Sequence, residues 1–162
     1  MGRQEVAAYF HAIGRDDLQI CDFDTSCATV ELAAAAVGVA PELIAKTLAF
    51  QLKERPVLIV MSGTARLSNR KFKEAFGEKA RMMPHDEALA LTGHAVGGVC
   101  PFGLKTPLDV YLDESLRKLE YVYPAAGARN NMVRVAVHEL PQLLDTANPR
   151  LWVDVAEEKQ EK

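Results

Sequence analysis

Lys46 is placed where its ammonium group could meet an anionic ligand. It stands between Ala45 and the run 47–50, at the point where a helical turn opened by Pro41 is expected to give way to a strand. A lysine in such apolar surroundings can neutralise a ligand as a flexible point charge. It can equally reach past its neighbours into water, as most lysines do. From its position alone we expect the Lys46 side chain to be solvated. A second feature is therefore needed to indicate a binding role.

A glycine-rich segment at 97–103, with the sequence GGVCPFG, is that second feature. Glycines let the main chain approach a ligand closely and present successive N–H groups, which an oxyanion or a phosphate requires. A simple turn would use the same glycines. The segment has neither the Gly-Lys-Ser/Thr ending of a nucleotide-binding loop nor the Gly-x-Gly-x-x-Gly spacing of a dinucleotide fold. It therefore remains open whether this segment binds an anion or only turns the chain.

Cys100 lies inside this segment and raises the question of a thiol nucleophile. His94 is the nearest base in the sequence, and no Gly-x-Ser-x-Gly elbow occurs. A free cysteine more often packs as a small apolar side chain. We therefore expect Cys100 to pack rather than to attack a substrate.

Two further segments carry charge. Residues 66–81 contain six basic and two acidic side chains in a chain whose net charge is −3. Such a local excess suits contact with a phosphate backbone, although a solvated helix face is the commoner explanation.

The turn at 127–131, with the sequence GARNN, contains residue types that tolerate positive φ, and its Arg129 could bind an anion or face water.

Composition excludes several other classes of protein. With 162 residues, 49% of them hydrophobic, the chain can bury one core without a disulfide framework. Its apolar runs are too short for a membrane span, its N-terminus has no secretion signal, and its three cysteines form no Cys-x-x-Cys pair, so we expect a cytoplasmic protein. The four histidines are scattered. We therefore expect neither a metal nor another cofactor.

Periodicity and end signals predict the elements that must position these residues. Thr29 and Ser68 are placed to cap helices that Gly38 and Gly77 would end. The long segment 94–107 has no regular period and is typical of a functional loop. The other predicted helices are 6–13, 85–91 and 138–144, and the predicted strands are 18–20, 47–52, 57–61 at the centre, 109–112, 121–123, 132–136 and 151–153 at an edge, followed by a frayed tail from 156. They predict a single α+β domain over 1–162 with a mixed sheet.

In this order, the motifs resemble the YbaK/EbsC family, the free-standing relatives of the editing domain of bacterial prolyl-tRNA synthetase. The resemblance covers most of residues 18–155. It rests on TVELAA at 29–34, VAPELIAKTL at 39–48, VGGVCPFG at 96–103, VYLDESL at 110–116 and GAR at 127–129.

The resemblance implies a partly barrel-like sheet flanked by helices, and hydrolysis of amino acids wrongly esterified to the 3′ end of tRNA-Pro or a related tRNA. The family's lysine maps onto Lys46, and its Gly-x-x-x-Pro loop maps onto 97–101. The catalytic residues would then be Lys46, Gly97 and Gly98, with N–H groups around the two glycines meeting the developing oxyanion. The implied substrate-binding residues are Phe23, Thr47, Val99, Cys100, Pro101, Phe102, Gly127 and Asn130, and the tRNA-binding residues are Arg70, Lys71 and Lys73.

The expected partners are a mischarged aminoacyl-tRNA and an aminoacyl-tRNA synthetase that would add avidity, since the net charge gives no general attraction to nucleic acid. The closing turn contains Ala125-Ala126-Gly127 where cysteinyl-specific relatives often carry a hydroxyl residue and two glycines. Cysteinyl, alanyl, seryl and threonyl esters therefore all stay open as substrates. A binding module for tRNA or a nucleotide, without catalysis, and a structural or regulatory interaction protein are the alternatives.

Overall fold

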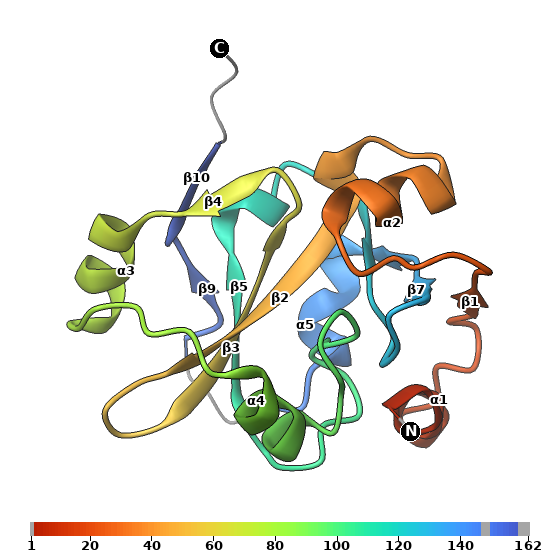
Figure 1. Cartoon of the computed structure of the whole chain (residues 1–162), viewed down its shortest axis with the longest axis horizontal. Coiled ribbons are helices and arrows are strands. Elements are labelled where there is room, and N and C mark those ends of the chain that lie inside the picture. Colours follow the sequence, from red (N-terminus) through yellow and green to blue (C-terminus); the bar gives the residue numbers. More distant parts are fainter. Residues whose placement is uncertain (1, 147–149, 159–162) are drawn as a thin grey trace.

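A curved six-stranded sheet forms the centre of the molecule in the computed structural model, which describes residues 2–146 and 150–158 (Figure 1). β2 runs antiparallel to β3 and parallel to β6, while β3, β5 and β9 run parallel to one another. The mixed sheet of the prediction is thus confirmed. In spatial order its strands are β8 (Val135–Ala136), β6 (Tyr121–Pro124), β2 (Ile44–Gln51), β3 (Pro56–Ser62), β5 (Asp109–Asp113) and β9 (Trp152–Val153).

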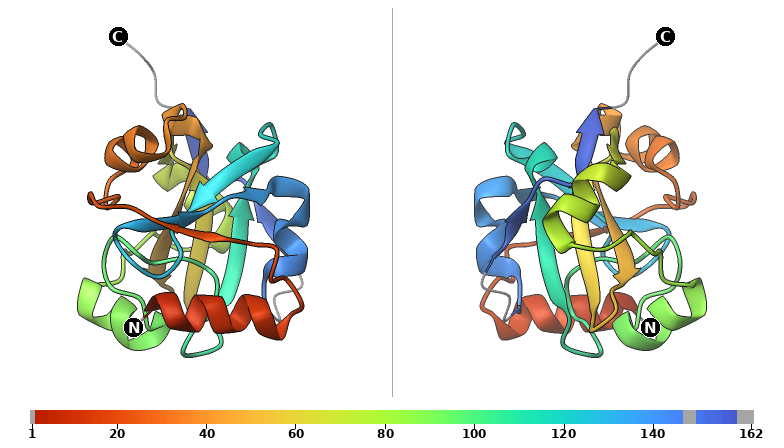
Figure 2. Two further views of the ribbon diagram at one scale, coloured as in Figure 1. Left: turned by 90° about the vertical axis from the view of Figure 1, so that its right-hand side faces the viewer. Right: turned by 90° about the vertical axis from the view of Figure 1, so that its left-hand side faces the viewer.

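Two small antiparallel sheets extend this curved sheet into a partial barrel (Figure 2). β1 (Ile20–Asp22) pairs with β7 (Asn131–Val133), and β4 (Ala65–Leu67) pairs with β10 (Ala156–Glu158). The expected fraying from 156 is therefore wrong for 156–158, because Glu157 lies opposite Arg66 and the two charges suit each other across the strands. The predicted strand 132–136 is split in two, since β7 and β8 pair with different neighbours.

Within residues 2–146 and 150–158, five α-helices and three 3₁₀ turns surround the sheets. Thr29 Oγ1 accepts the Leu32 N–H at 3.1 Å and Gly38 follows the same helix with φ +83°, so both predicted end signals are confirmed. Ser68 and Gly77 do the same for the basic helix. The helices are α1 (Gly2–Ala12), α2 (Val30–Val37), α3 (Asn69–Phe76), α4 (His85–Thr92) and α5 (Leu140–Leu143), and the 3₁₀ turns are η1 (Pro41–Leu43), η2 (Glu114–Leu116) and η3 (Val137–Glu139).

β3 separates two apolar cores, as its uninterrupted apolar sequence predicts for a central strand. Leu58 and Val60 point into the larger core, which contains Phe10 of α1, whereas Ile59 points into the smaller core against Phe72 of α3. This alternation follows from the two-residue period of a strand. In the described part of the chain, no helix is long and apolar enough to cross a bilayer.

Candidate active site

The outer edge of β2 is interrupted at its middle. At one end of the strand, the pairing with β6 stops at Ala45. At the other end, the Met83 N–H donates to the Ala49 carbonyl and the Gln51 N–H donates to the Arg81 carbonyl, both at 2.9 Å. Residues 46–48 lie between these two paired stretches. An open strand edge inside a folded domain exposes main-chain donors and acceptors to whatever binds there.

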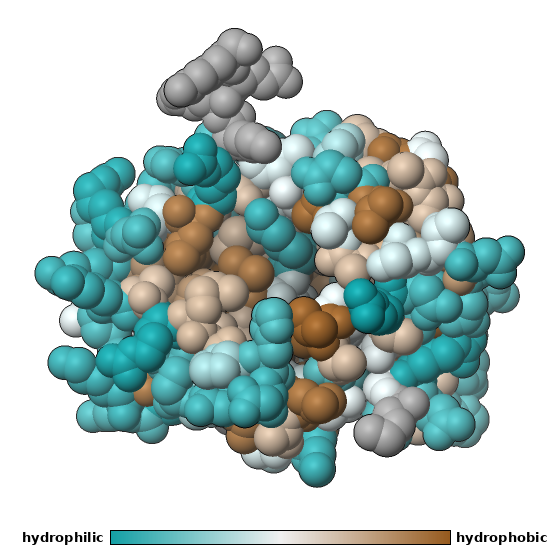
Figure 3. All heavy atoms as spheres, viewed as in Figure 1, coloured by the Kyte–Doolittle hydropathy of each residue, from teal (hydrophilic) through white to brown (hydrophobic). Residues whose placement is uncertain are grey.

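A cavity of about 370 Å³ lies against this open edge. This volume is near the lower end of the range for ligand pockets, roughly 300–1,000 Å³. Figure 3 shows the face of the molecule that carries α2, α4 and β2, with polar side chains around the periphery and apolar ones toward its middle. The cavity is lined by residues 44–49 of β2, residues 27–30 and 33 around the start of α2, residues 82, 83, 85 and 88 around α4, residues 96, 97 and 99 of the glycine-rich loop, and Tyr123, Ala125 and Met132.

Lys46 borders this cavity together with Gly97, so the structure brings the two principal candidates to one place. The Lys46 ammonium donates to the Ala65 carbonyl at 2.5 Å and to the Gly63 carbonyl at 3.4 Å. Gly63 lies in the β3–β4 connection, and Ala65 is the first residue of β4. They hold the lysine side chain, which is partly buried, on one side of β2. Lys46 itself is the third residue of β2 rather than a junction residue, because the strand begins at Ile44, three residues earlier than expected.

The glycine-rich loop packs its main chain directly against the turn 125–130. A Cβ atom on Gly98 would lie 2.7 Å from both the N and the Cα of Ala128, so only glycine permits this approach. The Gly98 N–H donates to the Ala95 carbonyl at 2.9 Å and is therefore not available to an oxyanion. Gly98 also lies outside the cavity lining, whereas Gly97, with φ +86°, is part of it. Of the two glycines, Gly97 is the one whose main chain can face a ligand.

Asn131 fixes the turn that supports this loop. Its buried side-chain oxygen accepts the Ala126 N–H at 3.1 Å and the Ala128 N–H at 3.2 Å, and its Nδ2 donates to the Ala126 carbonyl at 3.2 Å. The sequence had suggested that the asparagines here tolerate positive φ. Among the described residues only glycines have positive φ, and Asn131 instead satisfies the turn's polar main-chain groups.

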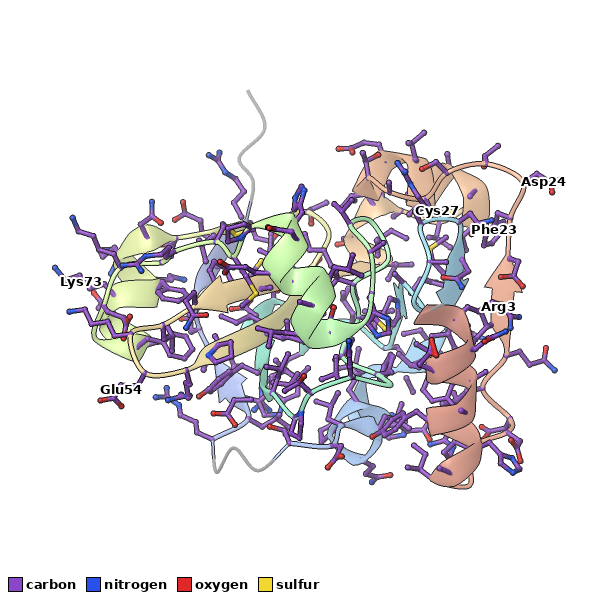
Figure 4. All side chains as sticks on the ribbon, turned by 60° about the horizontal axis from the view of Figure 1, so that its bottom comes forward. Arg3, Phe23, Asp24, Cys27, Glu54 and Lys73 are labelled. Atoms are coloured by element: carbon purple, nitrogen blue, oxygen red, sulfur yellow. The ribbon has the colours of Figure 1, made fainter. Side chains whose placement is uncertain are left out.

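Phe23 and Asn130 join the loop before α2 to the same turn. The Phe23 N–H donates to the Asn130 carbonyl at 2.8 Å, and Asn130 Nδ2 returns a hydrogen bond to the Phe23 carbonyl at 3.1 Å. Neither residue lines the cavity. Phe23 packs on the apolar cluster that includes Cys27, which does line it, and both lie beside α2 in Figure 4.

The remaining substrate-binding candidates fall into two groups. Thr47 and Val99 line the cavity. Cys100, Pro101 and Phe102 are buried behind it, and the Phe102 ring lies 5.0 Å from that of Phe10. Gly127 also lies outside the cavity lining.

The environment of Cys100 bears on the question of a nucleophile. Complete burial raises the pKa of the Cys100 thiol to about 12. A protonated, enclosed thiol is a poor nucleophile, which favours packing over catalysis.

Comparison with known proteins identifies the family to which this chain belongs. Residues 24–143 match the family described as the aminoacyl-tRNA editing domain. The chain belongs to the YbaK/EbsC family of editing domains. It is 40% identical over 159 residues to the protein YwhH of Bacillus subtilis (strain 168), whose name states no function, covering 98% of this chain and 99% of that protein.

Two further relatives have names that suggest an activity. A protein of Enterococcus faecalis (strain ATCC 700802 / V583), proposed in its name to be the Cys-tRNA(Pro)/Cys-tRNA(Cys) deacylase EbsC, is 32% identical over 110 residues, or 67% of each chain. A crystal structure described as a proposed trans-editing enzyme for prolyl tRNA synthetase superposes with a TM-score of 0.86 at 31% identity. It covers 96% of this chain and 97% of that one. The expected fold, a mixed α+β domain with a partly barrel-like sheet, is thereby confirmed.

The three basic candidates of this editing domain lie on α3. Arg70 pairs with Glu74 at 2.9 Å, and the Lys71 ammonium contacts Asp154 at 3.1 Å and the Ala156 carbonyl at 3.0 Å. Lys73 is exposed and extends from the end of the molecule opposite Phe23 (Figure 4). The segment that follows α3 returns to the cavity, because Met82 and Met83 line it.

Several lining residues were not foreseen from the sequence. Tyr123 and Met132 come from strands far along the chain, and Met82 and Val96 are apolar side chains that remain about half exposed at the cavity. His85, at the first position of α4, also lines the cavity. Among the residues that the structure describes, no group of histidine, cysteine and carboxylate side chains could hold a metal ion.

Proposed function

We propose that this editing domain is an aminoacyl-tRNA deacylase that hydrolyses a wrongly attached amino acid from the 3′ end of tRNA-Pro or a related tRNA. The observation that carries the proposal is that Lys46 and Gly97 line one cavity of about 370 Å³ in a chain of the editing-domain family. The names of the Enterococcus protein and of the trans-editing structure point to the same reaction.

The chemistry needs no side-chain nucleophile, because an aminoacyl ester is already an activated bond. The oxygen of a water molecule attacks the ester carbonyl, the bond from carbon to the ribose oxygen breaks, and a free amino acid and a tRNA hydroxyl are released. Positioning the ester and stabilising the oxyanion supply most of the required rate enhancement. In this proposal, Lys46 holds the terminal phosphate or the carbonyl region, and the Gly97 main chain faces the developing charge.

The small residues of the cavity suit a small acyl group. Ala28, Ala33, Ala45 and Ala125 line the cavity together with Cys27, and most of the lining residues are apolar. Such a pocket excludes larger side chains better than it separates acyl groups that differ by one methylene. Cysteinyl, alanyl, seryl and threonyl esters are therefore the first substrates to test.

The decisive experiment follows the loss of labelled amino acid from tRNA charged with each of these four residues. We expect at least one ester to be hydrolysed well above its spontaneous rate. Tight binding of the charged tRNA without hydrolysis would instead support the alternative, a binding module on the same fold. Absence of both binding and hydrolysis for all four esters would contradict the proposal.

A further inference from the structure

Thr47 occupies the centre of the open edge of β2, and its main chain points outward. The Leu52 N–H donates to Arg55 within the β2–β3 hairpin, whereas Ala49 and Gln51 bond to the segment 81–83 on the other side. Main-chain groups of an antiparallel strand alternate in direction from one residue to the next. Odd-numbered residues of β2 therefore face the outer edge, and Thr47 is the odd residue inside the gap.

Neither main-chain group of Thr47 has a hydrogen-bond partner within residues 2–146 and 150–158. The neighbouring odd positions are different, because Ala45 pairs with β6 and Ala49 accepts from Met83. The Thr47 hydroxyl is also buried without a partner. Unpaired main-chain groups inside a folded domain are uncommon, because their desolvation costs free energy that a partner would offset. Thr47 thus presents one donor and one acceptor at the cavity.

The other residues that line the cavity determine which ligand groups could bind the main-chain N–H and carbonyl of Thr47. Among the described residues, no aspartate or glutamate lines the cavity, so a cationic group of the ligand must be met by neutral oxygens. The Lys46 ammonium is drawn toward the carbonyl groups of Gly63 and Ala65, and strand alternation places its side chain on the other face of β2 from that of Thr47. The main-chain carbonyl of Thr47 is therefore available to a donor group of the ligand.

An aminoacyl ester carries the matching pair on a single residue. Its α-amino group is a donor and its ester carbonyl is an acceptor, in the arrangement by which a strand residue pairs with its opposite neighbour. We propose that the main chain of Thr47 binds these two groups, so that the site takes esters of amino acids with a free α-amino group and rejects N-acylated ones. This inference rests on the proposed deacylase function and adds the chemical feature that defines its substrates.

The pairing also has a catalytic consequence. The Thr47 N–H would point at the ester oxygen that becomes negatively charged, and a donor fixed in a strand needs no reorganisation when that charge forms. It would take the place of the Gly98 N–H, which already bonds to Ala95. The Thr47 carbonyl would select the amino group, because an N-acyl group removes the positive charge and leaves less hydrogen-bonding capacity.

The test compares ligands that differ only at the α-amino group. Non-hydrolysable analogues, in which adenosine carries cysteine, alanine, serine or threonine through a 3′-amide, are prepared with a free amine and with an acetylated amine. Calorimetry on the full chain measures their binding, and deacylation of the corresponding esters on tRNA is followed in parallel. Losing one charge-assisted hydrogen bond predicts that acetylation weakens binding of the preferred analogue about 30-fold.

The outcomes separate this inference from the proposed function. Preference for the free amine without hydrolysis of any ester would support Thr47 recognition and contradict the deacylase proposal. Hydrolysis that is equal for free and acetylated esters would support the deacylase and overturn the inference, as would equal or absent binding of both analogues.

A variant assigns the effect to the main chain. Thr47→Pro removes the outward N–H at an edge position, which strands tolerate. We expect the variant to bind the free-amine analogue about tenfold more weakly. Unchanged binding by a folded variant would overturn the role of the N–H, and if the variant fails to fold, the comparison of analogues still decides.

Discussion

Two hollows in the described part of the chain can be compared, and the one with the larger volume is the weaker candidate for catalysis. The second hollow, of about 500 Å³, lies between the β2–β3 hairpin, α3 and β5. Three of its polar side chains already pair with one another, because Arg55 Nε contacts Asp109 at 2.7 Å and the same guanidinium hydrogen-bonds to the Tyr111 hydroxyl. At the smaller cavity, by contrast, Thr47 keeps two main-chain groups without partners among the described residues.

From this difference we expect hydrogen-bonding groups without partners, rather than a large volume, to mark the binding site. A ligand entering the second hollow would have to break an existing ion pair, and the exchange would return little free energy. A ligand entering the cavity at β2 would form hydrogen bonds with groups that already lost their bonds to water when the chain folded. Perturbing the two hollows should therefore have different consequences.

The largest effect is expected where the loop of the first cavity meets its supporting turn. Gly98→Val places a side chain against the N and Cα of Ala128, which belong to the main chain and cannot rotate away. We expect a loss of about 3 kcal/mol in the free energy of unfolding, and a fall in deacylation of about 100-fold. Urea unfolding and single-turnover hydrolysis measure the two effects.

Gly77→Ala is the matched control for this change. Gly77 has φ +75° and open space around its Cβ position, so the variant should lose about 1 kcal/mol of stability and keep its activity. If Gly98→Val were as active as this control, the loop could not be a wall of the active site.

A buried histidine makes the stability of the same loop depend on pH. His94 Nε2 contacts the Phe102 carbonyl at 2.7 Å, and burial lowers the pKa of His94 below its usual value near 6.5. Above that value the histidine is neutral in the folded and the unfolded chain. Below it the unfolded chain takes up the proton first, so the free energy of unfolding should fall by up to about 1.4 kcal/mol per pH unit.

His94→Gln keeps a donor for the Phe102 carbonyl and removes this titration. Urea midpoints measured between pH 7.5 and 5.5, values chosen to bracket about 6.5, should therefore decrease less in the variant than in the wild type. Parallel decreases in the two proteins would show that other groups control the pH dependence.

The second hollow should tolerate a change that removes its ion pair. Arg55→Gln leaves Asp109 without its guanidinium, and because both side chains are partly exposed the cost should be about 1 kcal/mol of stability. Deacylation should stay within about twofold, since no group at the first cavity is altered. A large loss of activity would reverse the ranking of the two hollows.

The smallest effects are expected on α3, where paired and unpaired cations can again be compared. Lys73 has no ionic partner among the described residues, whereas Lys71 contacts Asp154. If α3 contacts tRNA, Lys73→Gln should reduce the slope of log K against log salt by about 1, and Lys71→Gln by less. Unchanged slopes in tRNA binding would remove α3 from the interface.

Features that depend on residues close in the sequence were predictable, whereas features that depend on distant residues were not. The caps at Thr29 and Ser68 depend on neighbours in the sequence, and both are confirmed. β10 was missed because its charged residues resemble a solvated tail, and only the distant Arg66 makes them a strand.

The site was predictable in its residue types but not in its geometry. Lys46 and the glycine-rich loop carry recognisable motifs, whereas the gap beside Thr47 exists because two remote segments pair with the ends of β2 and leave its middle open. Phe102 illustrates the same limit. The resemblance implied that Phe102 binds substrate, but its ring packs on Phe10, which lies far away in the sequence.

The central claim, that the cavity at β2 is where an aminoacyl ester is cleaved, is tested most directly by Lys46→Ala. The measurement is single-turnover deacylation of the preferred mischarged tRNA, with the unfolding midpoint recorded on the same protein. Among the described residues, Lys46 is partly buried and belongs to neither of the apolar cores beside β3, so the fold should persist while the rate falls about 100-fold. A folded variant that retains a rate within about threefold of the wild type would contradict the account.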